Sequence, residues 1–186
     1  MLILGETDAG ISRNTVKKIP YATISAKVGK GPKSLLVLAK KERGRHFWMS
    51  ADNAVIVTSE GRVVQTAGFP ENLKNTRFIG RDPVNRRLHL SEPPIRSLRE
   101  IDSEIDQRFG IPIYSKFQIE GPRDISIAQV KIKTLLVKEH NVAKTLNWDF
   151  TNYYWVDRFD GFIWKSRQKI AKSFPAIDIE VLKPAI

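Results

Sequence analysis

Residues 21–28 have the sequence Tyr-Ala-Thr-Ile-Ser-Ala-Lys-Val, in which every second side chain is apolar. In an extended strand, successive side chains point to opposite faces, so this alternation predicts a strand with one apolar face. The same period of two recurs in residues 113–120 and 177–181. Residues 34–40 and 53–58 instead contain continuous apolar runs, which are typical of strands buried on both faces.

Turn residues separate these predicted strands. They occur at Gly29–Pro32, Arg43-Gly44, Glu60-Gly61 and Asp160-Gly161, and they favour antiparallel hairpins. About ten strands in one chain predict a sheet that curls on itself. We therefore expect an all-β, single-domain antiparallel β-barrel or barrel-like sandwich with at most short helices. A poorly specified N-terminal arm (residues 1–18) is expected to precede the β domain (residues 19–186).

Three segments have ambiguous patterns. Residues 70–78 are compatible with a short helical turn. Residues 94–109 fit an amphipathic helix, but Glu100, Asp102, Glu104 and Asp106 would share one face of a strand, and this row favours the strand. Between residues 125 and 137 the apolar positions change from odd to even, which predicts a β-bulge near Ala128-Gln129.

The composition restricts the possible functions. The 186 residues include 31 Lys and Arg against 20 Asp and Glu, which gives a formal net charge of +11 and favours acidic partners. The chain contains no Cys, so disulfides, thiolate metal sites and a Cys nucleophile are excluded. The longest uninterrupted apolar run, residues 35–39, is far shorter than the ~18 residues of a membrane-spanning helix.

No catalytic or metal-binding motif is recognisable. The patterns G-x-S-x-G and H-E-x-x-H do not occur, and His46, His89 and His140 are too scattered to form a ligand set. The acidic row at residues 100–106 offers oxygen ligands for Ca²⁺ but lacks a Gly-containing loop, so we interpret it as a solvated face paired with basic neighbours. We predict no catalytic residues, no metal and no cofactor. A carboxylate pair acting on a polysaccharide stays open, because its separation is a three-dimensional property.

The strongest concentration of charge lies between residues 27 and 45, where seven basic residues accompany one acid, Glu42. We predict that a hairpin gathers five of these cations into a contact site for a polyanion or glycan: Lys27, Lys40, Lys41, Arg43 and Arg45. The alternative is that these charges only maintain solubility and protect strand edges. Nucleic acid is not expected, because no DNA- or RNA-binding motif is present.

Aromatic residues are concentrated between residues 148 and 164. We expect most of them to fill the core or its rim. A sugar-stacking platform is the alternative, because the faces of Trp and Tyr suit amphipathic ligands.

Several motifs together resemble a known family. They are residues 46–58, 61–66, 82–83, 154–157, 161, 166–168 and 182–184. Their order and spacing are similar to those of the YjbF/GfcB (YmcC-like) lipoproteins of bacterial exopolysaccharide and capsule operons. The residues that carry this resemblance are Trp48, Asp52, Gly61, Thr66, Asp82, Trp155, Asp157, Gly161, Ser166 and Gln168.

Physical chemistry predicts structural roles for several of these residues. We expect Trp48 and Trp155 to fill the core. Asp52 and Asp157 are expected to accept backbone N–H bonds where strands enter turns. Gly61 is expected to adopt a positive φ in a hairpin turn, and so is Gly161.

The resemblance implies a barrel-like fold, no established enzymatic activity, and an accessory role in exopolysaccharide or capsule secretion. It also implies an outer-membrane lipoprotein facing the periplasm. Together with the positive charge of the chain, this predicts acidic polysaccharide, export proteins or both as partners. Attachment to the membrane would be only through a lipid anchor. The family's signal peptide and lipidated Cys do not occur in this chain, and we expect both upstream of Met1. The alternatives are an enzyme acting on a polysaccharide and a carrier of hydrophobic cargo, which would need a wide apolar interior.

Overall fold

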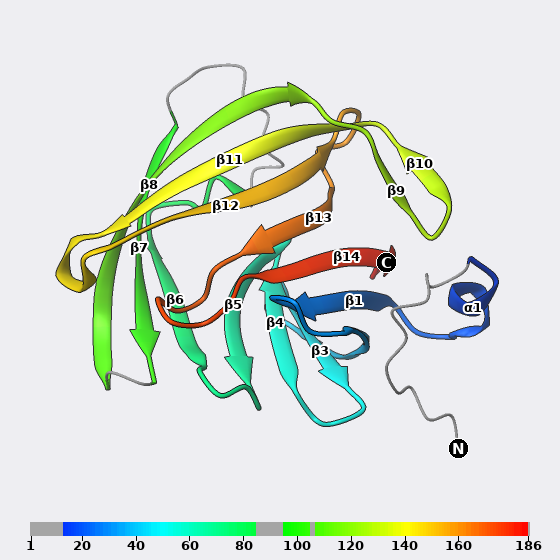
Figure 1. Cartoon of the computed structure of the whole chain (residues 1–186), viewed down its shortest axis with the longest axis horizontal. Coiled ribbons are helices and arrows are strands. Elements are labelled where there is room, and N and C mark those ends of the chain that lie inside the picture. The colour runs from blue at the N-terminus through cyan, green and yellow to red at the C-terminus, as the bar shows by residue number, and fades with distance from the viewer. Residues whose placement is uncertain (1–12, 85–94, 105–106, 186) are drawn as a thin grey trace.

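A computed structural model describes residues 13–84, 95–104 and 107–185. Twelve antiparallel strands form one sheet that curls into a nearly closed barrel (Figure 1). The strand order is β5-β4-β3-β2-β1-β14-β13-β12-β11-β8-β7-β6, so β5 and β6 are the two edges. The predicted all-β antiparallel barrel is confirmed.

The strands of the first half of the chain are β1 (Thr23–Val28), β2 (Lys33–Glu42), β3 (Arg45–Ser50), β4 (Val55–Ser59), β5 (Arg62–Ala67), β6 (Leu73–Ile79) and β7 (Arg96–Ser103). The second half adds β8 (Arg108–Pro122), β11 (Thr134–Ala143), β12 (Trp148–Asp157), β13 (Ile163–Gln168) and β14 (Ile177–Lys183). A separate hairpin is formed by β9 (Ile125–Ile127) and β10 (Val130–Ile132).

The described helices are short. They are α1 (Arg13–Lys18) and the 3₁₀ turn η2 (Lys144–Leu146). Within the described ranges, no helix combines the length and the apolar character required to cross a membrane.

Because neighbouring strands are antiparallel, the turns alternate between two ends of the barrel. We call one end the mouth; it carries the β2–β3, β4–β5 and β12–β13 turns, the β9–β10 hairpin and the end of β14. In Figure 1 the end of β14 and the β9–β10 hairpin mark the mouth at the right. The opposite end, the far end, carries the β1–β2 and β11–β12 turns.

The structure resolves the three ambiguous segments. The expected helical turn at residues 70–78 is wrong, since most of this segment is strand β6. The preference for a strand within residues 94–109 is confirmed by β7 over Arg96–Ser103. The predicted bulge is also wrong: Ala128 and Gln129 have φ angles of 46° and 68°, the conformation of a tight two-residue turn, and they connect β9 to β10.

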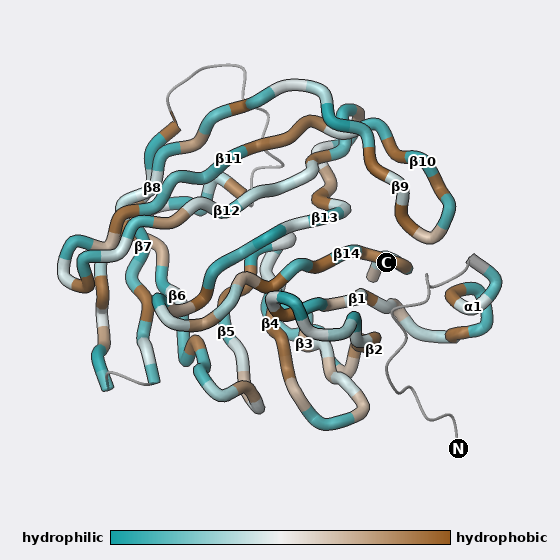
Figure 2. The backbone as a smooth tube through the Cα atoms, viewed as in Figure 1, coloured by the Kyte–Doolittle hydropathy of each residue, from teal (hydrophilic) through white to brown (hydrophobic). Residues whose placement is uncertain are grey.

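Two apolar clusters fill the interior. The larger one includes Ile24, Leu36, Trp48, Ile113 and Ile177, and the smaller one includes Val84, Phe117, Val137, Tyr154, Val156 and Ile163. Figure 2 shows hydrophobic residues interspersed with hydrophilic ones along the strands, as expected where one strand face is buried.

The two motif tryptophans lie on different sides of the barrel wall. Trp48 is buried as predicted, and its indole N–H donates to Thr58 Oγ1 over 2.8 Å. The expectation for Trp155 is wrong, because the inward positions of β12 are the even ones from Trp148 to Val156. Trp155 is half-buried on the outer face, where the Lys165 ammonium lies 5.4 Å from its ring centroid.

Candidate functional site

A network of buried charges crosses the barrel interior. Glu139 on β11 is fully buried, and its carboxylate accepts hydrogen bonds from Arg62 at 2.8 and 3.0 Å and from Arg99 at 2.9 Å. Asn152 Nδ2 and the Tyr154 hydroxyl donate to the same carboxylate at 2.9 and 3.0 Å. Five donors occupy all the acceptor positions of a carboxylate.

Asp82 completes the charge balance of this network. It accepts hydrogen bonds from Arg62 Nε at 2.6 Å and from Nη2 at 3.0 Å, so two carboxylates face two guanidinium groups. Burial by itself would raise the pKa of Glu139, but the charges of Arg62 and Arg99 hold that pKa well below its usual value of 4.5. Burial likewise raises the pKa of Tyr154 well above 10.0. A carboxylate that is held ionised and fully engaged is suited to specifying structure and unsuited to proton transfer.

Gln168 on β13 bridges the barrel interior to the edge strand β5. Its Oε1 accepts the Val63 backbone N–H at 3.0 Å, and its Nε2 donates to the Gly61 carbonyl at 2.8 Å and to Ser166 Oγ at 2.9 Å. Gly61 has φ 93°, and a Cβ there would lie 2.9 Å from Ile163 Cβ. Thr66 Oγ1 then accepts the Leu73 N–H at 3.0 Å, which links β5 to β6. Gln168 therefore ties β13 to the start of β5, and Thr66 links the two edge strands.

The remaining motif residues stabilise turns, as expected from the sequence. Asp157 accepts the Phe159 N–H at 2.8 Å and the Trp164 indole N–H at 3.0 Å. The Ser50 hydroxyl donates to Asp52, and this bond, together with backbone N–H bonds, lowers the pKa of Asp52. Gly161 has φ 74° in the β12–β13 turn.

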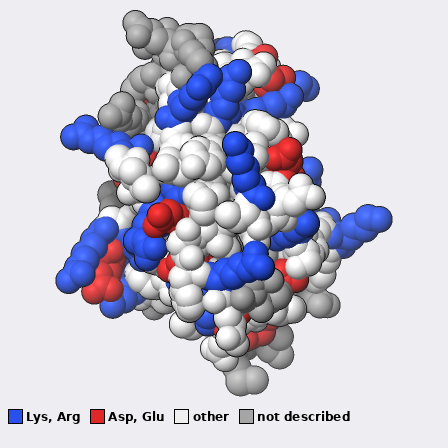
Figure 3. Space-filling model, turned by 90° about the vertical axis from the view of Figure 1, so that its left-hand side faces the viewer, with Lys and Arg blue, Asp and Glu red and all other residues white. Residues whose placement is uncertain are grey.

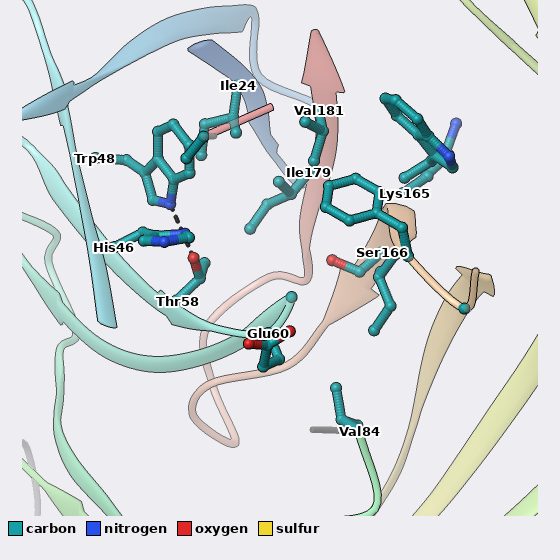
Figure 4. Close-up of a pocket in the computed structure, with 16 residues that line it drawn as sticks. Ile24, His46, Trp48, Thr58, Glu60, Val84, Lys165, Ser166, Ile179 and Val181 are labelled. Atoms are coloured by element: carbon teal, nitrogen blue, oxygen red, sulfur yellow. Dashed lines mark hydrogen bonds between the residues drawn. The ribbon is translucent and has the colours of Figure 1, made fainter. Parts of the chain in front are cut away.

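A cavity of about 90 Å³ opens at the mouth (Figure 4). We call it the mouth cavity. Its apolar wall includes Ile24, Val84, Ile163, Ile179 and Val181, and its polar lining includes His46, Thr58, Glu60 and Ser166. In Figure 4 the Ser166 hydroxyl points into the space between Ile179 and Glu60.

His46 forms part of the cavity lining. Its ring packs edge-on against Trp48, with centroids 5.8 Å apart. Burial lowers the pKa of His46 below 6.5, the nearby charge of Lys41 lowers it further, and Glu60 opposes both effects. The imidazole is therefore neutral at pH 7 and gains a charge only in acid.

The basic tip of the β2–β3 hairpin adjoins this cavity. Lys41 is paired with His46 in the β2–β3 ladder, so both side chains lie on the same face of the sheet. Lys40 lies on the other face, 5.7 Å from the Phe47 ring centroid and 2.8 Å from Glu42. We call Lys40, Lys41, Arg43 and Arg45 the basic tip.

The structure separates Lys27 from the basic tip. Lys27 pairs with Lys33 at the far-end turn, whereas Lys40 is seven residues further along β2, roughly 23 Å away in an extended strand. The five predicted contact residues therefore do not form one patch, because consecutive hairpins place their turns at opposite ends of the shared strand. Figure 3 views the far end, where Lys and Arg are distributed over the face with uncharged surface between them.

The acidic row is paired with cations, in agreement with its interpretation as a solvated face. Glu100 lies 3.0 Å from Arg77, and Glu104 lies 2.6 Å from Lys74. Asp106 and His89 fall outside the described residues. In the part of the chain that the structure describes, no three carboxylate or imidazole side chains are grouped to hold a metal ion.

Sequence reasoning missed the network residues Arg62, Arg99 and Glu139. The alternation of buried residues in β11 contained a signal for one of them. Glu139 lies at an odd position, between the inward residues Val137 and Asn141. A charged residue in phase with buried ones predicts a paired interior charge.

The fold and the site define a single antiparallel β-barrel with a filled, ion-paired interior and a small cavity beside a cationic hairpin. The chain belongs to the YjbF family, described as group 4 capsule polysaccharide lipoprotein GfcB, YjbF, whose model matches residues 1–182. The predicted family is therefore confirmed.

Two relatives come from Escherichia coli (strain K12). The uncharacterized lipoprotein GfcB is 26% identical over 179 residues, covering 96% of this chain and 83% of GfcB. The uncharacterized lipoprotein YjbF is 22% identical over 183 residues, covering 98% of this chain and 85% of YjbF. The crystal structure of the hypothetical lipoprotein YmcC from Escherichia coli (K12) has a TM-score of 0.85 at 26% identity, covering 96% of this chain and 92% of YmcC.

The family is thus associated with capsule polysaccharide, and the lipoprotein nature of the homologues implies a location in the cell envelope. None of these descriptions indicates an enzymatic activity.

Proposed function

We propose that this protein is a non-catalytic accessory factor of capsule or exopolysaccharide secretion at the periplasmic face of the outer membrane, and that it binds an acidic polysaccharide at its mouth. The supporting observation is the pairing of Lys41 with His46, which places Lys41 of the basic tip on the same face of the hairpin as the cavity lining.

The basic tip supplies the electrostatic part of this binding. Lys40 and Arg43 are exposed, and Arg45 is half-buried beside them. Carboxylates repeated along a glycan would contact these cations, and each contact is weak because water and salt screen it over about 8–10 Å. Several contacts together hold and steer a polyanion.

The mouth cavity supplies the selective part. Its volume of about 90 Å³ is smaller than the roughly 150 Å³ cavity that encloses a benzene molecule, so it suits a substituent and not a whole sugar ring. An acetyl group fits its chemistry: the methyl would contact Ile24 and Ile179, and the carbonyl would accept a hydrogen bond from the Ser166 hydroxyl.

The two alternative functions, an enzyme acting on a polysaccharide and a carrier of hydrophobic cargo, have less support. Glu139 and Asp82 are engaged by Arg62, so the buried carboxylates do not form an acid–base pair facing a substrate. The mouth cavity is too small for a lipid chain, which disfavours a cargo carrier that uses the barrel interior.

The test is titration with a uronate-rich and a neutral glycan at low and at physiological salt. We expect binding of the acidic glycan only, weakened by salt. Lys41→Ser/Arg43→Ser should weaken it about fivefold, the effect of two exposed contacts of about 0.5 kcal/mol each. Lys27→Ser/Lys30→Ser removes the same charge at the far end and serves as the matched control. Equal affinity for both glycans, or an unaffected tip variant, would reject the proposal and favour an export protein as the partner.

A further inference from the structure

An apolar groove lies beside the mouth, between α1, the β9–β10 hairpin and the end of β14. Its volume is about 410 Å³, and its lining is mainly apolar, including Val16, Ile127, Ile132, Trp164 and Leu182. Lys17 and Lys183 also line it. The groove is therefore larger than the mouth cavity and has cations within its lining.

Two exposed apolar side chains flank this groove. Phe159 in the β12–β13 turn is 85% exposed, and Val130 on β10 is 40% exposed. The turn that presents Phe159 is fixed next to the hairpin, because the Arg158 N–H donates to the Lys133 carbonyl at 3.3 Å and Arg158 Nη2 donates to Asp124 at 3.2 Å. The fold thus holds a large aromatic side chain in water at a defined position.

The charge around the groove is predominantly positive. Lys131 lies between the lining residues Val130 and Ile132 of β10, so its side chain points to the opposite face of the hairpin. Lys17 and Lys183 line the groove, and the segments beside it contain the cations Lys18, Arg123, Lys133 and Arg158 and the acids Asp124, Asp157 and Asp160. Asp124 is paired with Arg158, and Asp157 accepts hydrogen bonds from the Phe159 backbone N–H and the Trp164 indole N–H. We call the groove, Phe159, Val130 and these cations the groove surface.

We propose that the groove surface docks on an anionic lipid bilayer. Aromatic and aliphatic side chains at the edge of a basic surface suit the interfacial region, where apolar groups reach the acyl boundary and lysines reach anionic headgroups. Long Lys side chains can lay their methylene stems on the groove and keep their ammonium groups at the headgroups. This contact is additional to lipid anchoring and independent of glycan binding at the basic tip.

Two other occupants fit the groove surface less well. A polysaccharide would satisfy the cations but would leave the apolar groove and Phe159 without matching groups. A second copy would place two similarly cationic surfaces against each other in an isologous interface. Because the relatives are lipoproteins, a lipid surface would also be held close to the chain, and weak contacts then suffice.

The test is sedimentation of the chain with vesicles of phosphatidylglycerol mixed with phosphatidylcholine, compared with vesicles of phosphatidylcholine alone. We expect binding to the anionic vesicles that weakens with salt. Phe159→Ser/Val130→Ser and Lys17→Ser/Lys183→Ser should each reduce binding about tenfold. Tyr114→Ser/Lys116→Ser, on the outer face of β8, is the matched control and should bind as the parent does. Unfolding midpoints would verify that all variants are folded.

A second readout locates the contact. Vesicles with brominated acyl chains should quench tryptophan fluorescence, and Trp164→Phe should lose the quenchable component.

Equal binding to neutral vesicles, unchanged binding of both groove-surface variants, or quenching unaffected by Trp164→Phe would each overturn the proposal. A dimer in light scattering that Phe159→Ser/Val130→Ser dissociates would assign the surface to a second copy. If the parent does not bind vesicles and Lys17→Ser/Lys183→Ser loses uronate binding, the groove surface would be assigned to glycan.

Discussion

Arg62 and Arg43 are the same amino acid in opposite surroundings. Arg62 is 2% exposed and donates four hydrogen bonds to Asp82 and Glu139, whereas Arg43 lies exposed at the β2–β3 turn with φ 47°. Removal from water makes the first charge expensive unless it is fully paired, so it specifies one arrangement of the interior. Solvation makes the second charge inexpensive and available to a partner. The cations of this sequence therefore have two different roles. Paired charges inside the barrel specify its structure, and solvated charges on its surface are available for binding.

The largest effect should come from removing the interior charge. Arg62→Met leaves Asp82 and Glu139 buried with too few cations, so we expect a loss of about 3–5 kcal/mol of unfolding free energy. Arg43→Met is the matched control and should change stability by less than about 0.5 kcal/mol. Urea denaturation measures both, and similar midpoints for the two variants would show that the network contributes nothing particular.

The next effect separates the inside of the wall from its outside. Trp48→Ala should cost about 3–5 kcal/mol, because it leaves a cavity and orphans Thr58. Trp155→Ala removes a half-buried ring and a cation–π contact with Lys165, so about 1–2 kcal/mol is expected. Equal losses in thermal or urea unfolding would contradict the outward position of Trp155.

Mild acid should lower the stability of the parent by a smaller amount, and His46 should account for this loss. His46 has a lowered pKa in the folded chain, so the unfolded chain binds the extra proton first, and stability decreases as the pH falls below about 6.5. Glu139 also has a lowered pKa, but its contribution is complete above about 4.3 and is lost only at lower pH. Unfolding midpoints measured between pH 7 and pH 5 should therefore fall for the parent and stay nearly constant for His46→Gln. An identical decline in the two proteins would count against this assignment.

The smallest effect on stability should come from the basic tip. Lys41→Ser/Arg43→Ser removes exposed charges, and its melting temperature should match that of the parent because exposed pairs contribute about 0–1 kcal/mol. Differential scanning fluorimetry measures it beside the glycan titration. A marked loss of stability would mean that the tip is part of the fold and unsuitable as a test of binding.

Local alternation was sufficient to predict many of the strands, among them β1, β8 and β14, and several of their turns. The Glu60-Gly61 and Arg43-Gly44 turns carry positive φ angles at both residues, as the hairpin interpretation of the sequence requires. The acidic row of β7 also followed from its period of two. The bulge predicted at Ala128-Gln129 was wrong, because a two-residue turn and a bulge both move the apolar residues from odd to even positions.

The site depended on long-range pairing that no local pattern contains. Arg62 meets Glu139 across 77 positions of sequence, and Gln168 meets Val63 across 105. The face of Trp155 depended on the register of β12, since a shift by one residue exchanges inside and outside. The position of Lys27 depended on which end of β2 each turn occupies. These relations become visible only when the sheet order is known.

Gln168 joins β13 to the start of the edge strand β5 across the barrel interior. By occupying the Val63 N–H and the Gly61 carbonyl, Gln168 denies these edge groups to any incoming strand from another molecule. The β5–β6 closure has no continuous ladder and uses side-chain bonds such as the one from the Leu73 N–H to Thr66 Oγ1, so we expect the sheet to open there first. Gln168→Ala should therefore speed amide exchange at Val63 and leave the start of β5 open to pairing with another molecule.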